Sequence, residues 1–303
     1  MNKYPVSVVL CALNEGKRIK DTIESVKRNK PEEIIVVEGG STDDTVAVAE
    51  LYADLVFSVK ESGLGYKRAF GVEKAKQKYI LTLDSDQILN NDSLEIMINE
   101  LEENNFAGIQ ARTKSLRNTT YWEKAMEFNV YDARPIIHRK SKEKNGQEYP
   151  KPTKMIGTPA LFKSEVLKKY NFNKSITGSC DDTDLCYRLT KIGYDLGISS
   201  TICYQKHRSD LLSTFKKFSW YGEGDCEFAF LHPERFLKIF LHPLKNYVIK
   251  KSFISILKRK PKFVPYFIFT GLVRHFNFYK YFIKRLIGIT KDSRSMNLHD
   301  YKY

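Results

Sequence analysis

Short apolar runs alternate with segments of helical period over residues 5–112. The runs at residues 5–12, 33–37 and 79–83 consist mostly of apolar and β-branched side chains, which is typical of strands covered on both faces of a sheet. Between the first two runs, apolar residues recur at helical spacing over residues 15–28. This alternation predicts an α/β fold with a mostly parallel sheet flanked by helices.

The same reasoning assigns the other elements up to residue 204. Asn14 is predicted to cap the first helix, and Asp92 to cap a later one. The polar, proline-marked residues 139–152 are predicted to form a mobile loop. Helices are expected at residues 45–52, 63–75, 93–103, 121–131, 164–169 and from about 181 to Gly193, and strands at residues 55–59, 106–111, 155–162 and 196–204.

The final quarter of the chain has a different composition. Residues 231–303 hold 16 Lys/Arg against 3 Asp/Glu, whereas the preceding residues hold 34 against 33. They also hold 15 of the 39 aromatic residues, and their longest uncharged run, Phe263–Val273, is too short to span a bilayer. Basic residues among large apolar ones favour helices on an anionic membrane surface. A plain amphipathic cap on the preceding domain is the main alternative. RNA binding is a weaker one, since no recognised nucleic-acid module is present, and no nucleic-acid partner is expected.

The cysteines and the start of the chain suggest a compartment. The five cysteines lack the paired spacing of zinc sites. Their odd number, without a charged and apolar leader at the start of the chain, fits a reducing environment. Cys180 and Cys186 flank an acidic segment and are predicted to be small buried hydrophobes rather than metal ligands.

Two carboxylates follow the strand predicted at residues 79–83. Asp84 and Asp86 come where this strand gives way to a loop, the edge at which open α/β sheets bind ligands. Two hard oxygen ligands this close suit Mg²⁺ or Mn²⁺. An isolated Asp-x-Asp is more often a solvated turn that caps a helix, so the rest of the chain has to decide between the two interpretations.

Two further segments combine a turn with a helix start. Glu38-Gly39-Gly40-Ser41 joins a strand to a capped helix, where glycines allow close backbone approach and the helix N-terminus attracts anions. Asp181, Asp182 and Asp184 open another helix. A plain turn and simple capping by acidic residues remain the alternatives for these two segments.

Four segments together carry a resemblance that none carries alone. They are Asn14-Glu15, Glu38–Asp43, Arg68–Asp86, and Cys180–Tyr194 followed by His207. Their order and spacing over residues 5–210 resemble a family 2 glycosyltransferase of the GT-A fold. The resemblance implies a catalytic domain over residues 1–210, with a nucleotide-sugar-binding half at 1–112 and an acceptor half at 113–210. Residues 211–303 are then expected to be a helical, membrane-surface extension.

The resemblance implies a role for each matching residue. Asp182 is expected to be the general base, and a divalent metal (Mn²⁺ or Mg²⁺) is expected on Asp84, Asp86 and His207. Glu38 stands where the family has Asp, which leaves the donor open among UDP-, GDP- and dTDP-sugars. The implied donor-binding residues are Leu13, Asn14, Glu15, Glu38, Gly40, Ser41, Arg68, Asp84, Ser85 and Asp86. The implied acceptor-side residues are Gly157, Thr158, Asp181, Trp220 and Tyr221. For the two aromatic residues, packing against the sheet edge is an equal alternative.

The chemistry agrees with that assignment. A divalent ion stabilises the negative charge on a departing nucleoside diphosphate, a contact that Arg68 would strengthen, and a carboxylate base removes the proton of the acceptor hydroxyl. One base opposite the leaving group implies direct displacement with inversion at the anomeric carbon. With the basic tail, this predicts a peripheral enzyme on the cytoplasmic face of the cell membrane, acting on a lipid-linked or cell-surface glycan.

Two other functions remain open. A nucleotidyltransferase also uses metal-binding carboxylates on an α/β sheet, but it has no need for the Asp181-Asp182 pair. An inactive nucleotide-sugar-binding membrane scaffold would have no need for Asp84, Asp86 and Asp182, all of which are present.

Overall fold

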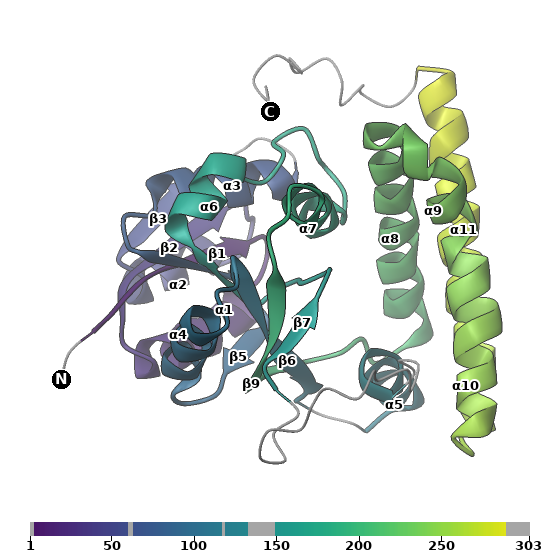
Figure 1. The fold of residues 1–303 in the computed structure, drawn as a ribbon, viewed down its shortest axis with the longest axis horizontal. Helices are drawn as coiled ribbons and strands as arrows, with labels where there is room; N and C mark the ends of the chain where they lie inside the picture. Colours follow the sequence, from purple (N-terminus) through teal and green to yellow (C-terminus); the bar gives the residue numbers. More distant parts are fainter. Residues whose placement is uncertain (1–2, 60–62, 117–118, 133–148, 289–303) are drawn as a thin grey trace. The chain divides into compact units, whose positions relative to one another are not determined.

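The computed structural model describes residues 3–59, 63–116, 119–132 and 149–288. The chain forms two compact units (Figure 1). Among the described residues, the first unit comprises 3–59, 63–116, 149–174 and 181–206, and the second comprises 119–132, 175–180 and 207–288. Most of the predicted loop at residues 139–152 falls outside the described residues.

A nine-stranded sheet organises the first unit. Its order is β3-β2-β1-β4-β8-β6-β9-β5, with β7 paired to β9. The strands are β1 (Tyr4–Ala12), β2 (Pro31–Glu38), β3 (Leu55–Ser58), β4 (Tyr79–Asp84), β5 (Gln87–Leu89), β6 (Gly108–Ser115), β7 (Lys151–Thr153), β8 (Ala160–Lys163) and β9 (Leu196–Gln205).

The sheet is parallel in its first half and mixed in its second. Strands β3, β2, β1 and β4 run parallel, whereas β8 is antiparallel to both β4 and β6. The parallel register sets Ala12 beside Glu38 and Cys11 beside Asp84. The predicted parallel arrangement therefore holds for the strands that carry Glu38 and Asp84 to the same edge.

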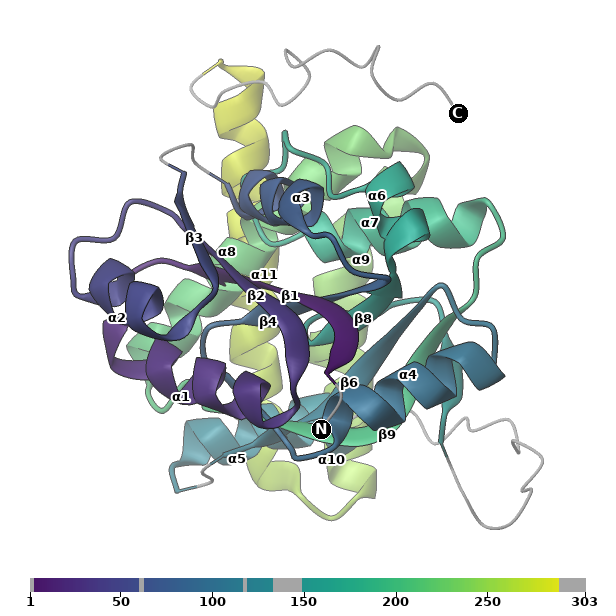
Figure 2. The same cartoon turned by 90° about the vertical axis from the view of Figure 1, so that its left-hand side faces the viewer.

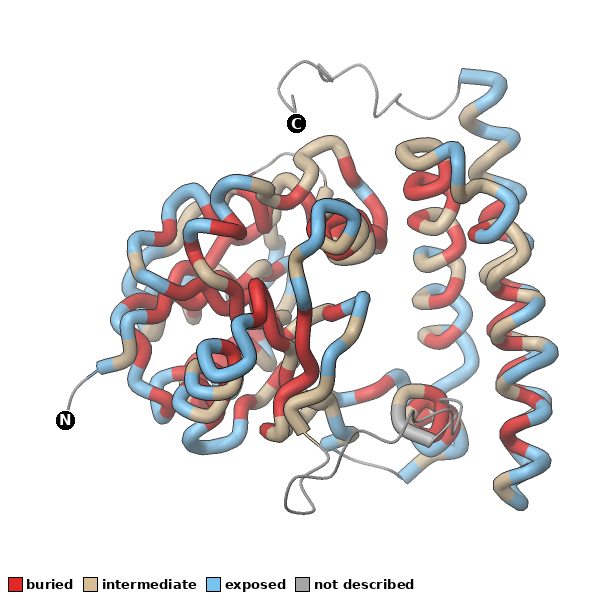
Figure 3. Tube along the Cα trace, viewed as in Figure 1, coloured by how far each residue is buried: buried red, intermediate tan, exposed pale blue. Residues whose placement is uncertain are grey.

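Helices cover both faces of this sheet (Figure 2). One buried cluster joins the sheet to α1, α2 and α4, and another joins it to α3, α6 and α7. Neighbouring residues of β1 divide between them, because Val8 belongs to the first cluster and Val9 to the second. The central strands are accordingly the most buried part of the unit (Figure 3). The helices are α1 (Gly16–Arg28), α2 (Thr45–Tyr52), α3 (Leu64–Lys74), α4 (Ser93–Glu103), α6 (Ser164–Tyr170) and α7 (Asp181–Lys191).

The described part of the second unit is helical, as predicted for the extension. Buried aromatic side chains such as Phe218, Tyr266 and Phe267 form its core. Helices α8 and α11 approach closely, since a Cβ added at Gly222 would collide with the backbone of Arg274. The helices are α5 (Tyr121–Glu127), α8 (Leu211–Leu231), α9 (Phe236–His242), α10 (Ser252–Leu257) and α11 (Val264–Leu286), joined by π-helical turns at Phe128–Asp132 and Pro243–Lys251 and by 3₁₀ turns at Pro233–Arg235 and Pro261–Phe263.

Several local predictions were wrong at the boundaries of elements. Asn14 does not cap α1: it has a positive φ of 55°, and its side-chain oxygen accepts a hydrogen bond from the backbone of Thr42. Asp92 precedes α4 in a left-handed conformation and makes no side-chain cap. The strand predicted at residues 155–162 begins only at Ala160. Strands β5 and β7 were not predicted, because 3 residues each are too few to show a strand pattern of apolar and polar residues.

Candidate functional site

Asp84 ends β4 with both of its carboxylate oxygens in hydrogen bonds. Its Oδ1 accepts from Nη2 of Arg68 at 2.8 Å, and its Oδ2 accepts from Oγ1 of Thr158 at 2.6 Å. Its backbone N–H donates to the side chain of Gln87, which in turn donates to the carbonyl of Thr158. Asp84 is thus fixed in orientation, while 35% of its side chain stays exposed.

Arg68 on α3 joins Asp84 to the acidic start of α7. Its Nη1 lies 2.6 Å from Oδ2 of Asp181, and the exposed fractions of the two side chains are 6% and 1%. Burial lowers the pKa of Arg68, but Asp181 and Asp84 outweigh it and raise that pKa overall. Burial also leaves the pKa of Asp181 raised, although Arg68 opposes the shift. Arg68 therefore remains a cation that compensates two acids.

Asp182 follows Asp181 and has a different environment. Burial, with a further contribution from Asp181, raises the pKa of Asp182 to about 7. Its Oδ1 accepts from the backbone of Thr183 at 2.6 Å, and a Cβ added at Gly157 would lie 3.0 Å from its Oδ2. Gly157 therefore allows this carboxylate to lie close to the backbone beside it.

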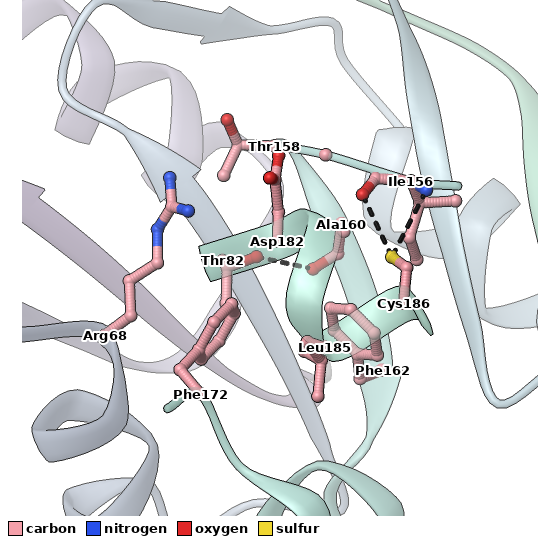
Figure 4. A pocket seen from close by; sticks show the side chains of 11 residues that line it. Arg68, Thr82, Ile156, Thr158, Ala160, Phe162, Phe172, Asp182, Leu185 and Cys186 are labelled. Atoms are coloured by element: carbon pink, nitrogen blue, oxygen red, sulfur yellow. Dashed lines mark hydrogen bonds between the residues drawn. The ribbon is translucent and has the colours of Figure 1, made fainter. Parts of the chain in front are cut away.

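Three polar side chains, from Arg68, Thr158 and Asp182, share a pocket (Figure 4). Apolar side chains, including those of Phe172 and Leu185, line the rest of it. A pocket that combines an apolar wall with a few convergent polar groups and a shifted pKa is typical of an active site.

Asp86 and Ser85 continue the chain from Asp84. The Oδ1 of Asp86 accepts from the side chain of Gln205 at 3.0 Å, and the backbone carbonyl of Ser85 accepts from Thr22 on α1. Both residues therefore belong to the described turn between β4 and β5. Gln205, the last residue of β9, is thus one of the groups that orient the carboxylate of Asp86.

Glu38 closes the turn after β2. It is 2% exposed, and its carboxylate accepts from the backbones of Gly40 and Ser41, each at 2.8 Å, and from the hydroxyl of Ser58. Burial raises the pKa of Glu38, but these hydrogen bonds lower it overall. The Glu38 side chain thus holds Gly40, whose φ of 87° favours glycine.

The turn after β1 lies against the turn after β2. The backbone of Asn14 donates to the side chain of Ser41, and the backbone of Glu15 donates to Thr45. Leu13 precedes them and is 49% exposed. The predicted donor-binding residues from the ends of β1 and β2 are therefore brought together.

Lys67 is a residue of this edge that the sequence reasoning missed. It is 9% exposed, and its ammonium group occupies the space that a side chain at Gly39 would take. Its neighbour Arg68 carried the recognisable pattern, so nothing in the sequence distinguished Lys67 from other lysines.

The second unit holds the remaining predicted residues. His207 is 4% exposed, and neither of its ring nitrogens has a hydrogen-bond partner among the described residues. Burial lowers the pKa of His207 to about 4, so the ring is neutral at pH 7. A buried polar ring without a hydrogen-bond partner is uncommon in folded proteins.

Trp220 and Tyr221 lie side by side on α8. Their rings stack with centroids 5.7 Å apart. Trp220 is 39% exposed, whereas Tyr221 packs edge-on against Phe218 of the core. Trp220 thus offers an accessible ring, and Tyr221 supports it.

Glu227 on α8 holds the segment that leads into α7. It is 2% exposed, and its carboxylate accepts from the backbones of Thr177 and Gly178 at 3.1 and 2.9 Å. A Cβ at Gly178 would lie 2.8 Å from its Oε2. Asp181 follows this segment by three residues in the chain, so Glu227 fixes the backbone just before the acidic pair. Glu227 lies 46 residues after Asp181 in the sequence, so this role could not be predicted from the residues around the acidic pair.

Replacing Glu227 by alanine is expected to reduce the free energy of unfolding by about 2–4 kcal/mol, because two backbone N–H groups would lose their acceptor. Unfolding in urea, followed by circular dichroism, measures the change. Glu234→Ala removes an acid whose side chain is 52% exposed and is the matched control with almost no effect. Equal stability of both variants would contradict the role given to Glu227.

The described residues hold no group of three or more His, Cys, Asp or Glu side chains placed to bind a metal. The cysteines are all unbonded to one another. Cys180 and Cys186 are 4% and 1% exposed, as expected for small buried hydrophobes. No described helix combines the length and the apolar character that crossing a bilayer requires.

Known proteins match this chain in sequence and in fold. The family described as "Glycosyl transferase family 2" matches residues 7–171, more than half of the chain. Cholesterol galactosyltransferase of Borreliella burgdorferi is 30% identical over 136 residues, which cover 38% of this chain and 37% of that protein. Poly-beta-1,6-N-acetyl-D-glucosamine synthase of Staphylococcus epidermidis is 29% identical over 120 residues, which cover 37% of this chain and 29% of that protein. This chain therefore matches well under two thirds of the length of these relatives.

A solved structure extends the likeness to nearly the whole fold. S. aureus TarS 1–349 superposes with a TM-score of 0.51 at 15% identity, covering 93% of this chain and 91% of that chain. A crystal structure of the same protein is a complex with UDP-GlcNAc and has the same TM-score of 0.51. At this identity the likeness concerns the fold alone.

Proposed function

Because the chain belongs to glycosyl transferase family 2, we propose that it moves a sugar from a nucleotide-sugar donor to an acceptor hydroxyl. The main support is the cluster in which Arg68 pairs with Asp84 and Asp181 and shares a pocket with Asp182. In one place it combines an oriented acid at the end of β4 with a second acid whose pKa lies near neutrality. These are the two chemical roles that sugar transfer needs.

Asp182 is the proposed general base. A pKa raised to about 7 makes its carboxylate a stronger base than an ordinary Asp while a large fraction stays ionised at neutral pH. Its Oδ atoms would accept the proton of the acceptor hydroxyl as the new bond to the anomeric carbon forms. A single base of this kind implies one displacement, and so inversion at that carbon.

Asp84 and Asp86 are the proposed ligands of a divalent metal, Mn²⁺ or Mg²⁺, with His207 as the third. The donor chemistry supports this proposal, because each carboxylate oxygen of Asp84 keeps a lone pair beside its one hydrogen bond and because the His207 ring is neutral and lacks a hydrogen-bond partner among the described residues. When bound, the ion supplies Lewis-acid stabilisation of the leaving diphosphate. Arg68 and Thr158 hold Asp84 in one orientation for that role.

Asp84→Asn is expected to weaken Mn²⁺ binding by about tenfold or more, because a charged ligand becomes neutral. Titration calorimetry with Mn²⁺ alone measures this without turnover. Asp21→Asn, in an exposed part of α1, is the matched control. An unchanged affinity in Asp84→Asn would remove Asp84 from the metal site.

The donor is proposed to bind at the edge formed by the turns after β1 and β2. The residues are Leu13, Asn14, Glu15, Glu38, Gly40 and Ser41, with Arg68, Asp84, Ser85 and Asp86 at the end of β4. UDP-, GDP- and dTDP-sugars are the candidate donors. UDP-GlcNAc, present in the TarS complex, is the first to test, by thermal stabilisation in the presence of Mn²⁺.

The acceptor is proposed to be a lipid-linked or cell-surface glycan on the cytoplasmic face of the membrane. Gly157, Thr158, Asp181, Trp220 and Tyr221 are the proposed acceptor-side residues, and Asp181 is also the buried partner of Arg68. The names of the two relatives refer to a sterol acceptor and to a glycan polymer, which supports a membrane-presented acceptor. We propose residues 1–210 as the catalytic domain and residues 211–303 as the extension that binds an anionic membrane surface.

A further inference from the structure

Helix α11 presents a stripe of exposed apolar side chains. They recur every three or four residues, the spacing that places side chains on one helix face. The exposed residues are Ile268 (39%), Leu272 (51%), Phe276 (63%), Tyr279 (52%), Ile283 (40%) and, just after the helix, Ile287 (63%). We call this set the α11 stripe.

The α11 stripe is separate from the face that α11 buries. Tyr266, Phe267 and Phe278 are each at most 1% exposed and belong to the opposite side of the helix. A helix that only caps a domain buries one apolar stripe and turns a polar face to solvent. Because α11 has apolar side chains on both faces, the hypothesis that it only caps a domain does not explain the exposed α11 stripe.

A second exposed apolar group precedes α11. Four side chains on the π-helical turn and α10 are exposed by more than half: Ile249 (65%), Phe253 (59%), Ile256 (55%) and Leu257 (63%). Exposed basic residues follow at once, at Arg259, Lys260 and Lys262. Several large apolar side chains exposed on neighbouring elements are typical of an interaction site.

Charge identifies the class of partner. Residues 231–288 contain 13 Lys/Arg and a single acid, Glu234. Arg274, which is half-buried, pairs with Asp225, whose Oδ1 lies 2.6 Å from its Nη2. A second copy of this chain would bring the same positive charge to the interface, and a nucleic acid would have no use for the apolar stripe. An anionic lipid surface matches both features.

We infer that the α11 stripe, together with the exposed side chains of α10, lies in the interface of an anionic bilayer, with the helix in the membrane plane. Large apolar side chains enter the acyl boundary, and the neighbouring lysines and arginines contact phosphate groups. This inference rests on the proposed membrane association, and it identifies the side chains that contact the membrane.

Vesicle sedimentation of the full chain tests the inference. The probes are vesicles of phosphatidylcholine alone and of phosphatidylcholine with phosphatidylglycerol. The test variant is Leu272→Ser/Phe276→Ser/Ile283→Ser. The matched control is Leu51→Ser/Leu116→Ser/Ile192→Ser, which removes three apolar side chains of the first unit that are 78%, 50% and 40% exposed.

The wild type and the control are expected to bind anionic vesicles and to bind neutral ones weakly. The stripe variant is expected to lose about tenfold or more of its partition, because three apolar side chains no longer enter the interface. Its hydrolysis of a soluble nucleotide-sugar, which depends on Asp84 and Asp182, is expected to be unchanged. If the wild type shows no such hydrolysis, the proposed sugar transfer is contradicted, whereas the proposed membrane-binding surface is not.

Three results would overturn the inference. The stripe variant could bind vesicles as well as the wild type does, or the wild type could bind neutral and anionic vesicles equally. The third result is that the wild type is a dimer, the stripe variant is a monomer and neither protein binds vesicles, which would assign the stripe to contact with a second copy. Circular dichroism checks that the variant is folded.

A fluorescence experiment tests insertion separately. Phe276→Trp keeps the aromatic bulk, and its fluorescence is expected to be quenched by brominated lipid in anionic vesicles. An unquenched signal would contradict insertion.

Discussion

Asp182→Asn is expected to reduce sugar transfer by about 10²- to 10⁴-fold, the range that removal of a general base produces. The amide keeps the size of the side chain and cannot take a proton from an acceptor hydroxyl. Because the pKa of Asp182 is raised to about 7, kcat/KM of the wild type is expected to fall as the pH drops below 7. The residual activity of the variant should lose this dependence. Asp195→Asn, an exposed acid beyond α7, is the control.

Asp182→Asn is expected to raise the stability of the protein above neutral pH, although it reduces sugar transfer. The pKa of Asp182 is raised from an ordinary 3.8 to about 7, so the folded state binds its proton more tightly than the unfolded chain does. Stability of the wild type therefore falls as the pH rises from about 4 to 7, and above pH 7 the cost of the buried charge is fully present. Asp182→Asn removes that cost, and its Tm at pH 8 is expected to exceed the wild-type Tm. A lower Tm at pH 8 would contradict the environment described for Asp182.

Arg68→Met is expected to lower the free energy of unfolding by about 3–5 kcal/mol, because it leaves two acids without their shared cation in a buried place. Arg68 and Asp181 are 6% and 1% exposed, so water cannot replace the lost pair. Thermal and urea unfolding measure the loss. Arg18→Met, whose side chain is 42% exposed in a pair with Glu15, is the matched control with a change of less than about 1 kcal/mol.

A double-mutant cycle tests whether the loss comes from the pair. Burial already raises the pKa of Asp181, and removal of Arg68 raises it further, so the cost of Arg68→Met should shrink as the pH falls and Asp181 takes up a proton. Asp181→Asn is expected to recover a large part of the stability lost by Arg68→Met. Additive effects of the two substitutions would show that the two side chains are not coupled.

The sequence predicted the α/β fold and the family because both depend on order along the chain. Buried strands with helical segments between them identify a parallel sheet, and such a sheet carries Glu38 and Asp84 to one edge. The order and spacing of the four segments, from Asn14-Glu15 to His207, then identified the family, which the match over residues 7–171 confirms.

Contacts between distant segments could not be predicted in this way. Arg68 reaches Asp181, which lies 113 residues further on, and Glu227 holds Gly178 from 49 residues away. Neither pairing leaves a periodic signal. Asn14 shows the same limit locally: its type favours a helix cap, but its side chain instead joins the turn that contains Thr42.

The basic tail illustrates a third case. Composition predicted helices and an anionic surface as partner, but it could not say which face of which helix is exposed. The exposure of Leu272 and Phe276, opposite the buried Phe267, is what separates a surface-binding helix from a plain cap.

The proposed sugar transfer is tested by the release of nucleoside diphosphate from UDP-, GDP- and dTDP-sugars, measured with Mn²⁺ for the wild type, Asp84→Asn and Asp182→Asn. We expect turnover of at least one donor by the wild type and a loss of about 10²-fold or more in both variants. Equal rates in all three proteins would contradict it.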